Sequence, residues 1–204
     1  MQALLHLDIA LFWLINSHHS PVADVFFTAV TQLGSGWVVM PLTLGYLAFF
    51  FRGEARRPLI VGALAFALAG LGSVALKREV NRDRPHEYFV HDLPGGAPPR
   101  LVHLVAAPVA GRSFPSGHST NAFAAAILLG TLLGRRWWWA LLAAATVGWS
   151  RIYVGAHFPL DVLAGAVLGS GVSLATVLAS GASNRPTSIR TRARPGAQDE
   201  RQRP

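Results

Sequence analysis

The chain of 204 residues contains no cysteine, and only 14% of its residues are charged. Without cysteine, neither a disulfide, a thiolate nucleophile nor a cysteine-ligated zinc can take part in its chemistry. Soluble domains carry roughly 25% charged residues, whereas hydrophobic residues make up 51% of this chain. The composition therefore predicts a membrane protein with one domain.

Acidic residues are scarce as well, since 10 Asp and Glu stand against 18 Lys and Arg. A positive balance can indicate nucleic-acid binding, but here most basic residues lie in short linkers between apolar runs and in the C-terminal tail. These residues are Arg52, Arg56, Arg57, Arg135, Arg136 and the arginines of residues 181–204. We expect no nucleic-acid partner, because this placement is typical of the cytoplasmic loops of membrane proteins.

Long apolar runs predict membrane-embedded helices. The runs most suited to crossing a bilayer are 34–51, 59–76, 119–133, 137–150 and 160–178. Two earlier stretches, 4–15 and 22–33, predict a short or tilted helix near the membrane surface and a second helix that follows it. We expect an all-α integral-membrane bundle of about six helices, formed by residues 1–180.

The basic linkers also predict the orientation of the chain. If the spans alternate, the positive-inside rule places the linkers in the cytoplasm together with residues 181–204, whose composition predicts a disordered tail. The proline-rich segment 77–114 and the turn after Ser150 then lie at the extracytoplasmic end of the bundle. Loops as long as 77–114 are uncommon in a compact domain and are often functional.

Three polar clusters meet at this extracytoplasmic end, within residues 77–85, 115–118 and 150–161. Because a charged residue at the bilayer centre costs of order 2.5 to 3.5 kcal/mol, such clusters indicate a functional site. Lys77, Arg84 and Arg151 supply positive charge, and arginine suits phosphate oxygens. Ser116 and Gly117 precede a predicted helix, whose first N–H groups form a natural anion site.

Two histidines in these clusters predict the reaction. If one helix carries His157 and Asp161, their spacing puts the imidazole and the carboxylate on one face, although such a pair can also be a polar contact between helices. Only His157 has a carboxylate at this spacing, so we assign it as the nucleophile and His118 as the acid that protonates the leaving oxygen. The implied reaction is phosphoester hydrolysis through a phosphohistidine. No ligand spacing predicts a metal, and no other cofactor is expected.

These motifs resemble the type-2 phosphatidic acid phosphatase superfamily. Its signatures are a lysine with Arg-Pro seven residues on, then Pro-Ser-Gly-His, then Ser-Arg followed by histidine and aspartate, and residues 77–161 match all three in order. The resemblance implies the family's integral-membrane branch. It also implies that His157, His118 and Asp161 are catalytic and that the phosphoryl group is bound by Lys77, Arg84, Ser116, Gly117 and Arg151.

Other charged residues match no position of this family. We interpret Arg78 and Arg82 as interfacial charges, and Arg112 as part of a solvated loop.

The function expected from the sequence is hydrolysis of a lipid phosphate or diphosphate, with undecaprenyl diphosphate favoured. Phosphatidate, phosphatidylglycerophosphate and diacylglycerol diphosphate remain alternatives, because the signatures recognise the phosphate and not the lipid tail. A non-catalytic lipid-binding protein or a transporter is a further alternative. The long apolar runs argue against the superfamily's soluble acid phosphatases and vanadium haloperoxidases. The expected partners are the lipid substrate and membrane lipids, and the oligomeric state stays open.

Overall fold

The computed structural model describes residues 2–91, 101–105, 108 and 110–182. Within them the chain is helical and forms no strand, which confirms the all-α fold class. Beyond Ala182, the tail expected from the sequence lies outside the described residues. The elements are α1 (Gln2–Asn16), α2 (Pro21–Gln32), α3 (Gly36–Phe50), α4 (Arg56–Val80), α5 (Pro85–His91), α6 (Gly117–Leu133), the 3₁₀ helix η2 (Arg135–Trp137), α7 (Ala140–Tyr153) and α8 (Pro159–Ser180).

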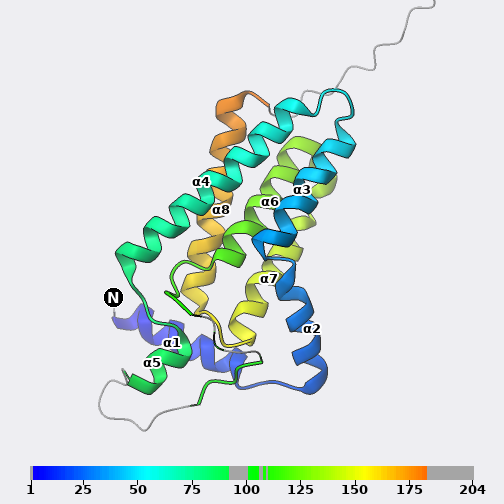
Figure 1. Cartoon of the computed structure of the whole chain (residues 1–204). Helices are drawn as coiled ribbons and strands as arrows, with labels where there is room; N and C mark the ends of the chain where they lie inside the picture. Colours follow the sequence, from blue (N-terminus) through cyan, green and yellow to red (C-terminus); the bar gives the residue numbers. More distant parts are fainter. Residues whose placement is uncertain (1, 92–100, 106–107, 109, 183–204) are drawn as a thin grey trace, which may run out of the picture.

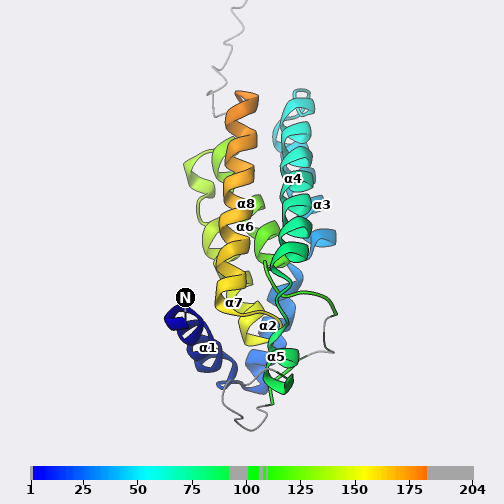
Figure 2. The same ribbon diagram turned by 90° about the vertical axis from the view of Figure 1, so that its left-hand side faces the viewer.

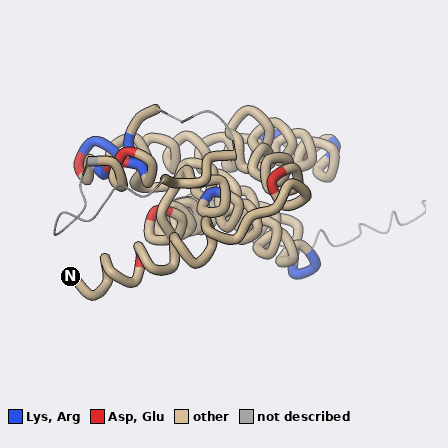
Figure 3. The backbone as a smooth tube through the Cα atoms, turned by 90° about the horizontal axis from the view of Figure 1, so that it is seen from below, with Lys and Arg blue, Asp and Glu red and all other residues tan. Residues whose placement is uncertain are grey.

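The long helices form an elongated bundle with α6 at its centre, where it packs against α3, α4, α7 and α8 (Figures 1 and 2). Helix α1 and the short helix α5 lie at the lower end of the bundle in Figure 1, beside α2. Charged residues occupy only a few places along the backbone when the molecule is seen from that end (Figure 3). The outer faces carry exposed apolar side chains such as Leu71, Val167 and Leu178, as expected for helices that face lipid.

In the part of the chain that the structure describes, two helices are long and apolar enough to cross a membrane by length and composition. One is in Arg56–Val90, which contains α4, and the other is α8. A third crossing arises if α2 and α3, which meet at an angle of 57°, form one broken span. The expected spans 119–133 and 137–150 appear as α6, with 17 residues, and α7, with 14, so both are shorter than the ~20 residues of a straight crossing.

Glycines explain how closely α6 and α8 approach each other. A Cβ atom on Gly165 would lie 2.4 Å from the backbone oxygen of Ser116, and one on Gly169 would lie 2.1 Å from that of Thr120. The two glycines are four residues apart and share one face of α8. Because α6 begins at the polar cluster 115–118, this contact fixes the start of α6 against the start of α8.

Two buried apolar clusters stabilise the two halves of the bundle. The upper cluster includes Leu47, Phe66, Leu128 and Val177 and joins α3, α4, α6 and α8. The lower cluster joins α1, α5, α7 and the start of α8, and consists of Phe12, Ile15, Phe89, Ile152, Tyr153 and Phe158. The helix α1 is therefore part of the core at the end of the bundle where the polar clusters lie.

The segment 77–114 is more helical than the sequence predicted. Helix α4 continues to Val80, because Lys77 and Arg78 in its last turn interact favourably with the helix dipole, and it ends at Asn81 in the left-handed conformation (φ 50°). Pro85 then begins α5, since a proline is well suited to the first position of a helix.

We expect Gly169→Ala to lower the free energy of unfolding by about 1 to 3 kcal/mol or more, because its methyl group would overlap the α6 backbone. Thermal unfolding in detergent measures the change. The matched control is Gly171→Ala on the same helix, where a Cβ atom meets nothing within 4 Å. Equal midpoints for the two variants would contradict this account of the α6–α8 contact.

Candidate active site

His157 lies in the turn that connects α7 to α8, and only 2% of it is exposed. The turn contains Gly155 with φ 77°, where a Cβ atom would lie 2.6 Å from the backbone oxygen of His103. The backbone N–H of His157 donates to the carbonyl of Arg151 over 3.2 Å. The condition that one helix carries both His157 and Asp161 is not met, because α8 begins only at Pro159.

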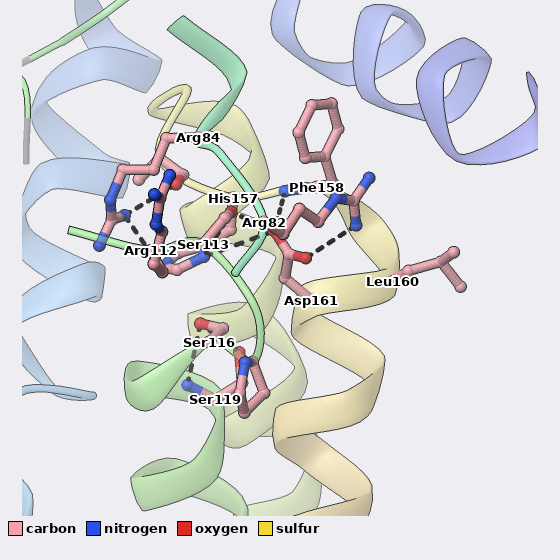
Figure 4. Close-up of polar contacts among 12 residues, drawn as sticks. Arg82, Arg84, Arg112, Ser113, Ser116, Ser119, His157, Phe158, Leu160 and Asp161 are labelled. Atoms are coloured by element: carbon pink, nitrogen blue, oxygen red, sulfur yellow. Dashed lines mark hydrogen bonds and ion pairs between the residues drawn. The ribbon is translucent and has the colours of Figure 1, made fainter. Parts of the chain in front are cut away.

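Asp161 lies in the first turn of α8 and faces His157 across the start of that helix (Figure 4). Its Oδ2 accepts the N–H of Phe158 over 2.8 Å and the hydroxyl of Ser113. The Nδ1 atom of His157 lies 3.6 Å from this Oδ2 and 3.4 Å from the Ser113 hydroxyl. The structure thus brings the predicted pair together, with Ser113 beside both partners.

Arg84 lies on the other side of the His157 ring. Its Nε donates to the carbonyl of Gly111 over 2.8 Å and its Nη1 to that of Ala156 over 2.9 Å. Nη1 also lies 3.4 Å from Nε2 of His157. Two carbonyls therefore fix the guanidinium beside the imidazole nitrogen that points away from Asp161.

A cavity of about 230 Å³ opens beside this pair and is lined by Arg84, His118 and Arg151 together with Thr28, Thr31 and Gln32 of α2. Arg151 is 5% exposed, and its Nη1 donates to the hydroxyl of Thr31 over 2.6 Å. Its Nε is buried without a hydrogen-bond partner in the described part of the chain. A basic cavity with an unused buried donor has the chemistry to hold an anion such as a phosphate. No sequence motif indicated the contribution of α2.

The remaining expected phosphate-binding residues lie at the end of α4 and the start of α6. Lys77 donates to the carbonyls of Arg112 and Pro115, over 2.9 and 2.8 Å, and so holds the segment that precedes α6. Ser116 caps α6, but its N–H donates to the carbonyl of Asp161 over 2.9 Å and is not the open donor that the sequence suggested. Gly117 begins the helix, where N–H groups have no intrahelical acceptor.

The protonation of His157 follows from its surroundings. Burial lowers its pKa to about 4, and the nearby charges of Arg151 and Arg84 act in the same direction. Asp161 opposes this shift without reversing it. The imidazole is consequently neutral near pH 7, as a nucleophile must be.

Arg82 was interpreted from the sequence as an interfacial charge, and the structure corrects this. Its guanidinium bridges two carboxylates, that of Asp161 at 2.8 Å and that of Asp8 at 2.5 Å, and its side chain is only 17% exposed. The guanidinium also lies over the ring of Phe158, 4.1 Å from the ring centroid. Arg112, in contrast, is exposed as expected and pairs with Asp83.

Among the described residues, no group of three or more His, Asp or Glu side chains is arranged to hold a metal ion.

The region of the chain that carries these site residues matches a known protein family. A family model described as the PAP2 superfamily matches residues 58–185, which contain every site residue predicted from the sequence. The chain belongs to the PAP2 superfamily. This confirms the resemblance drawn from the three signatures.

The PAP2 chain is similar to several characterised phosphatases. An undecaprenyl-diphosphatase of Sulfolobus acidocaldarius is 30% identical over 171 residues, which cover 83% of this chain and 77% of the relative. A lipid A 4'-phosphatase of Bacteroides thetaiotaomicron is 31% identical over 175 residues, with coverage of 83% and 75%.

Two solved structures share the fold of this PAP2 chain. Aquifex aeolicus LpxE gives a TM-score of 0.69 at 35% identity and covers 84% of this chain and 95% of its own. A transmembrane PAP2-type phosphatidylglycerolphosphate phosphatase of Bacillus subtilis gives 0.69 at 26% identity, with coverage of 91% and 90%. The PAP2 chain is thus a membrane lipid phosphatase, a phosphoric ester hydrolase.

The lowered pKa of His157 predicts a pH dependence of stability. Between pH 6.5 and about 4, the unfolded chain takes up a proton on this imidazole that the folded chain excludes. The thermal midpoint should therefore fall as the pH falls through this window, and the fall should be shallower in His157→Gln, which cannot be protonated. Thermal unfolding in detergent at several pH values checks this. Identical pH profiles for the two proteins would contradict the account.

Proposed function

We propose that this PAP2 phosphatase removes a phosphate or diphosphate head group from a membrane lipid through a phosphohistidine, without a metal ion. The proposal rests on the surroundings of the two ring nitrogens of His157, since one nitrogen faces a carboxylate and the other faces a guanidinium. Nδ1 lies 3.6 Å from a carboxylate oxygen of Asp161, and Nε2 lies 3.4 Å from the guanidinium of Arg84. A proton on Nδ1 leaves a lone pair on Nε2, directed to the side where a phosphate would be held.

In the first step, the lone pair on Nε2 of His157 forms a bond to phosphorus while the bond to the lipid oxygen breaks. His118 lines the cavity. It becomes protonated once the negatively charged head group binds beside it, and it donates that proton to the leaving oxygen. Asp161 stabilises the positive charge that develops on the His157 ring.

In the second step, His118 removes a proton from a water molecule, which attacks phosphorus. The phosphorus–nitrogen bond breaks, inorganic phosphate leaves and His157 regains its lone pair. Charge on the phosphoryl oxygens is stabilised by Arg84 and Arg151, with Lys77 and the N–H groups at the start of α6, from Gly117 on, completing the binding site. Ser116 positions this helix start through the bond from its own N–H to the carbonyl of Asp161.

Undecaprenyl diphosphate is the favoured substrate. The phosphatase site lies at the end of the bundle opposite the basic turn 52–57, and by the positive-inside rule that end is extracytoplasmic, where a spent isoprenoid diphosphate carrier would be found. The similarity to the undecaprenyl-diphosphatase supports this choice. Phosphatidylglycerophosphate is the second candidate, because the Bacillus subtilis neighbour covers 91% of this chain.

We predict that His157→Ala loses at least about 10³-fold in turnover, because the nucleophile is removed. The measurement is phosphate release from undecaprenyl diphosphate in detergent, with a chelator present throughout. Native release that requires added magnesium would overturn the metal-free mechanism. Undiminished release by His157→Ala would overturn the nucleophile assignment and leave the lipid-binding or transport alternatives.

The matched control is His6→Ala, since His6 is exposed on α1 and far along the chain from the signatures. It should keep native turnover. The same assay with phosphatidylglycerophosphate, phosphatidate and lipid A ranks the substrates by kcat/KM, and a higher value for any of these would displace undecaprenyl diphosphate.

The proposed orientation is tested with single cysteines, since the native chain has none. Leu101→Cys is expected to react with an impermeant thiol reagent in intact cells, because Leu101 is 90% exposed in the segment near the site. Glu54→Cys, in the exposed basic turn at the other end, should react only after lysis. The reverse pattern would place the site in the cytoplasm.

A further inference from the structure

We propose that Arg82, held by Asp8 of the N-terminal helix, positions Asp161 for its work on His157. The inference rests on the proposed function, because it assigns residues that act through the proposed carboxylate. Neither Arg82 nor Asp8 belongs to the three signatures, and neither lines the cavity. They are positioning residues and do not touch the substrate.

The first observation is that Arg82 divides its guanidinium between two fully buried carboxylates. Nη1 donates to Oδ1 of Asp161 over 2.8 Å, and Nη2 donates to Oδ2 of Asp8 over 2.5 Å. Both carboxylates have 0% side-chain exposure. An Arg–carboxylate contact in such a setting is strong and directional, so it fixes the plane of the Asp161 carboxylate.

The contact with Asp161 involves the oxygen that His157 does not use. Oδ2 accepts from Phe158 and Ser113 and faces Nδ1 of His157, whereas Oδ1 accepts from Arg82. Rotation of the carboxylate would break the Arg82 contact and the Phe158 contact together. Figure 4 shows the guanidinium of Arg82 reaching Asp161 beside the ring of Phe158.

Asp8 fixes the other side of the guanidinium. It is 2% exposed, and its Oδ1 accepts the backbone N–H of Leu160 over 2.8 Å. The carboxylate of α1 is thus anchored to the first turn of α8, the same turn that carries Asp161. Phe12, one helical turn further along α1, is fully buried against Phe89 and Phe158 and holds the helix in place.

The arrangement explains why an otherwise apolar helix carries a buried acid. Without Asp8, one half of the Arg82 guanidinium would be left in a buried site without its counter-charge, which is unfavourable. Without Arg82, two buried carboxylates would face each other with no cation between them. The charge balance of the site therefore requires Arg82 together with Asp8 and Asp161, which lie 74 and 79 positions from it along the chain.

The test compares single and double variants of Arg82, Asp8 and Asp161 in their release of phosphate from undecaprenyl diphosphate. The kcat of each variant is calculated from the concentration of folded, monodisperse protein. We expect Arg82→Gln to lower kcat by about ten- to a hundredfold and to leave KM within about threefold, because orientation is lost while the cavity is kept. Asp8→Asn should lower kcat in the same way but less. Arg82→Lys should recover part of the loss, since one ammonium can reach one carboxylate.

The decisive measurement repeats Arg82→Gln in an Asp161→Asn background. If Arg82 acts through Asp161, adding Arg82→Gln to the Asp161→Asn variant should lower kcat by less than about threefold. The same fold loss in both backgrounds would show that Arg82 acts on packing alone, and would overturn the inference. Native kcat in Arg82→Gln would overturn it as well. Native kcat in Asp161→Asn alone would instead overturn the proposed role of Asp161, so the two failures are distinguishable.

The matched control is Arg78→Gln, which removes a charge from the same segment at an exposed position. It should leave kcat and KM unchanged and lower the thermal midpoint only slightly, because Arg78 interacts with the dipole of α4 and with no site residue.

Discussion

The buried carboxylate of Asp161 is the constraint on which the rest of the site depends. An ionised carboxylate with 0% side-chain exposure is stable only when charged or polar donors surround it. Its donors come from three separate parts of the chain, namely the start of α8, the segment before α6 and the segment after α4. Burying one charge thus requires that all three segments take their places together.

The packing of α6 against α8 delivers this arrangement. Gly165 and Gly169 allow the α8 backbone to approach that of α6, and the N–H of Ser116 then reaches the carbonyl of Asp161 over 2.9 Å. The same approach places Ser113 near the Asp161 carboxylate and His118 at the cavity. A contact between apolar helices thereby sets the geometry of polar groups at one end of the bundle.

The sequence predicted the helices well, because apolar runs and small residues are local features. It also predicted that His157 and Asp161 lie together, on the condition that one helix carries both, and the pair meets although this condition is not met. Pro159 begins α8, so the two meet across a helix start and not along one helix face. Arg82 and Asp8 could not be predicted as partners, since 74 residues separate them and neither occupies a defined position of the three signatures. Nor does the residue type of Ser113 reveal a contact 48 residues away.

The partners of each basic residue distinguish structural from binding charges. Arg82 is compensated by two carboxylates, so little of its charge is left for a ligand. Lys77 and Arg84 donate to backbone carbonyls, which orient them without cancelling their charge. Arg151 donates to a neutral hydroxyl and keeps a buried donor unused. Positive charge therefore remains where the cavity lies, and a phosphate would supply the missing counter-charge.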